Sequence, residues 1–104
     1  MIRWKDSCRF DDLRSVLVLA VLRADTIYLA EGVNECWITS VNDSTHMATS
    51  KHYDGRAVDL RTHNVPNPET VANILRGALG PQFTVLYEGA GTSNAHIHVQ
   101  FNGR

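Results

Sequence analysis

Residues 95–101 alternate strictly between apolar and polar side chains, and this pattern constrains the fold more tightly than any other in the chain. Because successive side chains of a β-strand point to opposite faces of a sheet, the alternation predicts a strand with one apolar and one polar face. The apolar face of such a strand has to be buried against a core. The polar face carries His96, His98 and Gln100, which the core does not need.

Two segments with helical periodicity are suited to cover the apolar face. In residues 11–30 apolar side chains recur at steps of three and four residues, which predicts an amphipathic helix that ends before Gly32. Asn67 followed by a proline is typical of a helix start, and the apolar positions behind it predict a second helix up to Gly80. Pro81 prevents this second helix from continuing.

Three more strands are predicted over residues 35–41, 56–60 and 83–88, from their β-branched, aromatic and alternating apolar residues. The polar stretch 42–55 has neither a helical nor a strand period. The predicted order of elements is therefore α-β-β-α-β-β. This order favours an α+β fold in which two helices pack on one face of a mostly antiparallel sheet.

The composition suits one soluble domain. With 104 residues, 43% of them apolar, the chain can bury a single core, so we expect one domain over residues 1–104 and a monomer. The net charge is −1 and the basic residues are scattered, so we expect no nucleic-acid partner. The longest apolar run, residues 16–22, is far shorter than a membrane span, so we expect no membrane association.

The cysteines and the first residues bear on the compartment. Cys8 and Cys36 are too few for a disulfide scaffold and too far apart for a CxxC motif, so we interpret them as buried thiols, with a single disulfide as the alternative. The first residues lack the apolar segment and the cleavage site of a secretory signal. The sequence therefore predicts synthesis in the cytoplasm, and any action outside the cell needs another exit route.

All five histidines follow residue 45, and two of them share the polar face of the last predicted strand. Imidazoles at positions i and i+2, here His96 and His98, can reach one metal ion or one substrate. Neutral imidazole is also a common zinc ligand in proteins. The alternative interpretation of this pair is an incidental polar strand face.

A second group of candidate residues lies between His52 and Asp59. The Asp-Gly turn at 54–55 lets a loop histidine and a strand aspartate fold back toward the same point. Asp59 lies in an apolar run, where an unpaired carboxylate is costly unless a cation or hydrogen-bond donors compensate its charge. The alternative is an ion pair between Asp59 and Arg56 or Arg61.

Together the two groups resemble the signature of zinc metallopeptidases that cut peptidoglycan cross-peptides. This family includes D-Ala-D-Ala carboxypeptidases and the L-alanyl-D-glutamate endopeptidases of phages, and the signalling domain of hedgehog proteins is related to it in structure. The residues that carry the resemblance are Ser50-x-His52-x-x-Gly55-x-Ala57-x-Asp59 and the later His96-x-His98. The resemblance covers residues 37–101, and the chain is most similar to the small phage members of the family. The resemblance implies a hedgehog- and DD-peptidase-like fold.

The resemblance implies one Zn²⁺ ion as cofactor, held by His52, Asp59 and His98 with water in the fourth position. Three protein ligands plus water are also what a catalytic zinc site requires. Such a metal lowers the pKa of its water and polarises the scissile carbonyl. Glu88 matches an acidic residue near the metal, which implies a general-base role; a solvated carboxylate at a strand end is its alternative.

Further residues take roles from the same resemblance. His96 matches a histidine that donates to the bound water or the developing oxyanion, and His46 matches one that lines the zinc cleft as a second donor. Ser50 stands where the family has a serine that contacts substrate, and Tyr53 and Arg56 are candidates to line the cleft. The alternatives are a plain loop role for His46, packing for Tyr53 and surface solvation for Arg56.

One departure from the family pattern bears on specificity. Many of the carboxypeptidases carry an arginine upstream of the first zinc histidine that clamps the substrate carboxylate, and residues 41–45 contain none. We therefore expect an endopeptidase rather than a strict D,D-carboxypeptidase. Asp43 is available to bind a substrate amine or to orient His46, and His63 is expected at the surface.

The resulting hypothesis is an endolysin-like zinc metallopeptidase that hydrolyses an amide bond in the stem or cross-peptide of peptidoglycan. It would degrade the cell wall after release from the cell or as part of a virion. The alternative is a non-catalytic, hedgehog-like zinc-binding recognition module, and a weaker one is a His-x-His phosphoesterase. The presence of Glu88 and His96 favours the enzyme, since a structural zinc site needs neither.

Overall fold

The computed structural model describes residues 1–11, 13–41 and 56–103, which form two helices and one five-stranded sheet. In chain order the elements are β1 (Ile2–Trp4), α1 (Ser15–Ala30), β2 (Cys36–Val41), β3 (Ala57–Arg61), α2 (Pro68–Leu79), β4 (Phe83–Glu88) and β5 (His96–Phe101). The strands lie in the order β1-β2-β3-β5-β4. Among the strands of the described residues only the β1–β2 pair is parallel, so the predicted α+β class with a mostly antiparallel sheet is confirmed.

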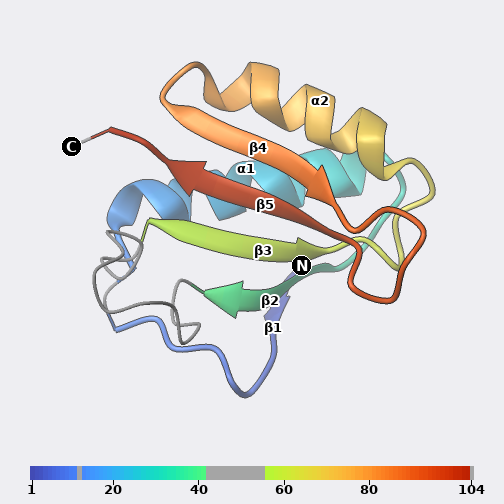
Figure 1. Cartoon of the computed structure of the whole chain (residues 1–104), viewed down its shortest axis with the longest axis horizontal. Coiled ribbons are helices and arrows are strands. Elements are labelled where there is room, and N and C mark those ends of the chain that lie inside the picture. The colour runs from blue at the N-terminus through green and yellow to red at the C-terminus, as the bar shows by residue number, and fades with distance from the viewer. Residues whose placement is uncertain (12, 42–55, 104) are drawn as a thin grey trace.

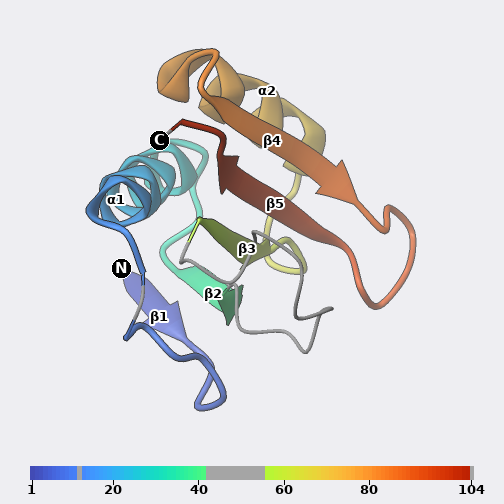
Figure 2. The same cartoon turned by 60° about the vertical axis from the view of Figure 1, so that its left-hand side comes forward.

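Both helices pack on the same face of the sheet, and neither covers the opposite face (Figures 1 and 2). The core between the two layers contains the fully buried side chains of Leu17, Tyr28, Leu60, Leu75 and Ile97. The phenol of Tyr28 donates a 2.8 Å hydrogen bond to the carbonyl oxygen of Arg61, which joins α1 to the end of β3. Polar strand residues collect on the face that the two helices do not cover, which is called the uncovered face below.

The second helix forms where the sequence predicts it. Asn67 precedes Pro68, which is the first residue of α2, although the Asn67 side chain makes no capping hydrogen bond. At the other end Gly80 has φ +88°, a left-handed conformation that favours glycine, and this ends the helix. The burial of Val71 and Leu75 follows the predicted apolar stripe.

Two predictions about the N-terminal region are wrong. The first helix starts at Ser15 and not at residue 11, because Arg14 has an extended backbone and offers no side-chain cap. The sequence pattern also gave no strand before this helix, whereas β1 pairs in parallel with β2, with Ile2 beside Cys36. Three residues with mostly exposed side chains leave too short a pattern for strand periodicity to be detected.

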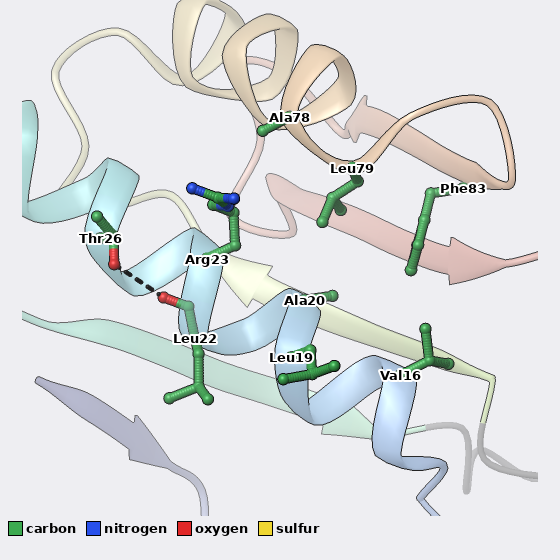
Figure 3. A pocket seen from close by; sticks show the side chains of 9 residues that line it. All are labelled: Val16, Leu19, Ala20, Leu22, Arg23, Thr26, Ala78, Leu79 and Phe83. Carbon is green, nitrogen blue, oxygen red and sulfur yellow. Dashed lines mark hydrogen bonds between the residues drawn. The ribbon is translucent and has the colours of Figure 1, made fainter.

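The first helix is apolar on more than its buried side. Leu19 is 65% exposed, and it lines a shallow groove between α1 and the connection from α2 to β4, together with Leu79 and Phe83 (Figure 3). At one end of this groove the Thr26 hydroxyl donates to the Leu22 carbonyl at 3.2 Å (Figure 3). At 16 residues α1 is about 24 Å long. Within the described ranges, no helix is both long and apolar enough to cross a bilayer.

The two cysteines are buried thiols, as predicted. Cys36 is fully buried in β2, and the thiol of Cys8 lies 3.6 Å from the carbonyl oxygen of Ile38, to which it donates. Burial raises the pKa of the Cys36 thiol to about 12, because the thiolate loses its hydration in the core. The reactive form of this thiol is therefore scarce at neutral pH.

We expect both thiols to resist alkylation in the folded protein. At pH 8 iodoacetamide should modify Cys36 at least about 100-fold more slowly in native buffer than in denaturant, because the thiolate fraction is small and the side chain is inaccessible. Mass spectrometry of the alkylated chain measures both rates. Equal rates in the two conditions, or a mass two hydrogens lower that identifies a disulfide, would contradict the placement of these residues.

Candidate metal centre

The candidate site lies on the uncovered face of three adjacent strands, β3, β5 and β4. Asp59 on β3 is the direct cross-strand partner of His98 on β5, and Glu88 at the end of β4 is the partner of His96. Their neighbours Leu60 and Ile97 are also paired but point into the core. Strand alternation thus brings two imidazoles and two carboxylates onto one face, as the sequence predicted for the histidines.

Asp59 and His98 form the centre of the cluster. The distance between Asp59 Oδ1 and His98 Nδ1 is 2.8 Å, and each side chain is 25% exposed. The alternative prediction, an ion pair between Asp59 and Arg56 or Arg61, is wrong, because the described residues form no such pair. Arg61 stacks on Trp37, with its guanidinium carbon 4.6 Å from the ring centroid. Arg56 donates from Nη1 to the Gly103 carbonyl at 2.9 Å.

His96 lies between the two carboxylates. Its Nε2 is 3.1 Å from Glu88 Oε1 and 3.8 Å from Asp59 Oδ1. Its Nδ1 is 2.6 Å from the carbonyl oxygen of Asn94, so a proton on Nδ1 is donated to the backbone and the ring is oriented. His96 therefore links Glu88 to the Asp59–His98 pair, and this places the predicted base beside the predicted metal ligands.

The turn before β5 holds the Asn94 carbonyl in this place. Gly89 has φ +70°, and a Cβ added there would lie 2.9 Å from the Asn94 oxygen. The Thr92 hydroxyl donates to the Gly89 carbonyl at 2.7 Å and closes the turn. The close approach of the two backbone segments requires glycine at residue 89.

The environment of His98 favours its protonated form. The pKa of His98 is raised above its usual value, first by the hydrogen bond to Asp59, then by that to Gln100 and by the charges of Asp59 and Glu88, against the opposing effect of burial. His98 Nε2 is 3.2 Å from Gln100 Oε1. Without metal, both ring nitrogens thus face acceptor oxygens. Gln100 is a site residue that the sequence interpretation missed, although the alternation placed it on this face.

The pair suits a zinc ion in its donor chemistry and spacing. Two ligand atoms on a tetrahedral zinc with bonds of about 2.0–2.1 Å stand about 3.3 Å apart, so Asp59 Oδ1 and His98 Nδ1 need to separate by only about half an ångström. Zinc would replace the proton that they share. Among the residues that the structure describes, no three metal-ligating side chains converge on one point. The third predicted ligand, His52, lies outside the described residues.

Several other predicted site residues also fall outside that part of the chain. They are Asp43, His46, Ser50 and Tyr53. Val41 and Val58, which lie on either side of the segment, are register partners in β2 and β3. His63 is exposed as predicted, with Nε2 3.2 Å from the carbonyl oxygen of Ser93.

Comparisons of the chain with protein-family models, with curated proteins and with solved structures give no match. The resemblance to peptidoglycan metallopeptidases therefore depends on the residues quoted above. The structure establishes the α+β class and the strand order. The hedgehog-like fold stays a prediction from the same residues.

The Asp59–His98 pair predicts a pH dependence of the metal-free protein. Because the folded-state pKa of His98 is raised, the pair stabilises the fold fully below the pH at which an unfolded histidine titrates, and this contribution is lost as the pH rises through the folded pKa. An NMR titration of the His98 ring should have a midpoint above that of a histidine in the unfolded chain. The Asp59→Asn variant should lower the His98 midpoint. No change in the His98 midpoint in this variant would contradict the pairing.

Proposed function

We propose that this chain is a zinc-dependent peptidase that hydrolyses an amide bond in the stem or cross-peptide of peptidoglycan. The observation that carries the proposal is the convergence of Asp59, Glu88, His96 and His98 from three neighbouring strands on one uncovered sheet face. The cluster supplies two of the three protein ligands that a catalytic zinc site needs and two candidate proton-transfer groups, with His52 as the predicted third ligand. The cluster is also partly exposed, so a large polymeric substrate can approach it.

Each residue has a separate task in this proposal. Asp59 and His98 would hold the metal, and zinc, when bound, supplies a water of lowered pKa and polarises the scissile carbonyl. Glu88, whose side chain is 48% exposed, is free to take a proton from the attacking water and return it to the leaving amine. Because Oε1 of Glu88 faces His96, Oε2 is the oxygen available for that proton.

His96 is suited to stabilise negative charge. The Asn94 carbonyl holds Nδ1, which leaves Nε2 directed toward the carboxylates and the region where the scissile carbonyl would lie. With the Nδ1 proton held by Asn94, a second proton on Nε2 makes the ring an imidazolium, whose Nε2–H can donate a hydrogen bond to the oxyanion that develops during attack. The absence of an arginine in residues 41–45 supports an endopeptidase over a carboxypeptidase.

Zinc content tests the ligand assignment. The purified chain should hold about one zinc per molecule, whereas His98→Ala and Asp59→Ala should each lose nearly all of it, because a site with one ligand fewer binds zinc far more weakly. His63→Ala is the matched control, since this exposed histidine contacts the Ser93 carbonyl and not the side chains of the cluster, and the variant should keep its zinc. Elemental analysis measures all four proteins, and equal zinc in wild type and His98→Ala would exclude the assignment.

Activity on purified peptidoglycan separates ligands from proton-transfer groups. Glu88→Gln and His96→Ala should retain zinc and lose about 100-fold or more in turnover, the usual scale for a general base or an oxyanion donor. Glu31→Gln, a matched change at the C-terminal end of α1, should keep full activity. Mass spectrometry of the released fragments identifies the bond that is cut.

The alternative function gives a different result in the same experiment. A zinc-binding recognition module, in which the same ligands stabilise a protein-binding surface, would hold zinc and release no fragments from the wall. Wild-type turnover in the Glu88→Gln variant would instead leave hydrolysis intact and remove the general-base role from that residue.

A further inference from the structure

A line of side-chain hydrogen bonds runs from the candidate metal centre along the polar face of β5. His98 Nε2 lies 3.2 Å from Gln100 Oε1, Gln100 Nε2 donates to Asn102 Oδ1 at 2.9 Å, and Asn102 Nδ2 donates to Thr84 Oγ1 at 2.6 Å. The backbone N–H of Asn102 also donates to the Gln82 carbonyl at 2.7 Å, which fixes the far end of the line. These hydrogen bonds therefore connect His98 on β5 with Thr84 on β4.

The direction of this line decides which nitrogen of His98 carries a proton. An amide has one accepting oxygen and one donating nitrogen, so Gln100 turns its oxygen to His98 because its nitrogen is used by Asn102. The accepting oxygen requires a proton on Nε2. The reversed line, with each amide turned over, would instead require an unprotonated Nε2 and a proton on Nδ1.

A histidine binds zinc through one nitrogen, and the partner of the other nitrogen selects which one. With Gln100 on Nε2–H, the nitrogen left for the metal is Nδ1, which lies 2.8 Å from Asp59 Oδ1. Asp59 can then be a ligand of the same ion. In the reversed arrangement Asp59 would accept Nδ1–H and only orient the ring, and zinc would bind Nε2.

We propose that Gln100 is a positioning residue of the metal centre: its side-chain oxygen holds the Nε2–H of His98 and thereby directs Nδ1 to zinc, beside Asp59. This inference rests on the zinc site of the proposed function.

The first test reads the His98 tautomer directly. In the zinc-loaded full chain labelled with ¹⁵N, long-range ¹H–¹⁵N correlation spectra distinguish Nδ1 from Nε2 and a protonated nitrogen from a metal-bound one. The expected result is zinc on Nδ1 and a proton on Nε2, with the resonances assigned by their loss in His98→Gln. Zinc on Nε2 of His98 would overturn the proposal, and this readout does not depend on any Gln100 variant folding well.

The second test measures zinc affinity in three variants. Gln100→Leu removes the acceptor and should weaken zinc binding about 10–100-fold, the usual effect of losing a partner that orients a metal ligand. Gln100→Glu keeps an acceptor at the same place and should bind within about threefold of wild type. Gln82→Leu makes the same chemical change at the exposed residue before β4, which contacts Asn102 through its backbone carbonyl, and should bind like wild type.

The outcomes separate this inference from the proposed function. If the wild type binds zinc and Gln100→Leu binds it equally well, Gln100 has no positioning role while the metal site stands. A lower melting temperature in Gln100→Leu with unchanged zinc affinity would likewise assign the residue a structural role only. If the wild type takes up no zinc, the proposed metal site fails and this inference fails with it.

Discussion

The antiparallel register between β3 and β5 is the constraint on which the rest of the structure depends. It places Asp59 opposite His98 and Leu60 opposite Ile97, so one alignment sets the polar pair and the core at once. Because side chains alternate strictly along a strand, a slip of one residue would turn Asp59 into the core and Leu60 to solvent. The energetic cost of burying Asp59 therefore protects the geometry of the candidate metal centre.

The two faces of the sheet have different roles. The helices cover one face and bury Val99 and its neighbours, while the other face keeps the histidines and carboxylates partly accessible. Partial burial strengthens the hydrogen bonds of the cluster without removing it from water altogether. The neighbouring strand β4 then supplies Glu88 at the end of the site, where its side chain stays exposed.

Sequence periodicity predicted the faces of the strands and the limits of α2 because both are local properties. The alternation in β5 was enough to place His96 and His98 together, and proline followed by a glycine stop was enough for α2. What periodicity cannot give is which strands are neighbours. The place of β5 between β3 and β4, and so the contact of His96 with Glu88, depends on pairing between residues far apart in the chain.

The remaining differences also have physical causes. The edge strand β1 pairs with β2 but is too short to show a pattern of its own, and α1 begins four residues late because the backbone of Arg14 is extended. Gln100 lay on the predicted face, but its proposed role depends on its contacts with His98 and with Asn102, which lies outside β5. The position of His52, the third predicted ligand, lies outside the described residues, so its part in the site stays a prediction.

The central claim is that Asp59 and His98 share one zinc ion. Anomalous diffraction at the zinc edge, from crystals of the zinc-loaded full chain, tests this claim most directly. The account predicts a single strong peak on the uncovered sheet face, bonded to Asp59 Oδ1 and His98 Nδ1 at about 2.0–2.2 Å. A peak bonded to other side chains, or no peak in crystals soaked with saturating zinc, would contradict it.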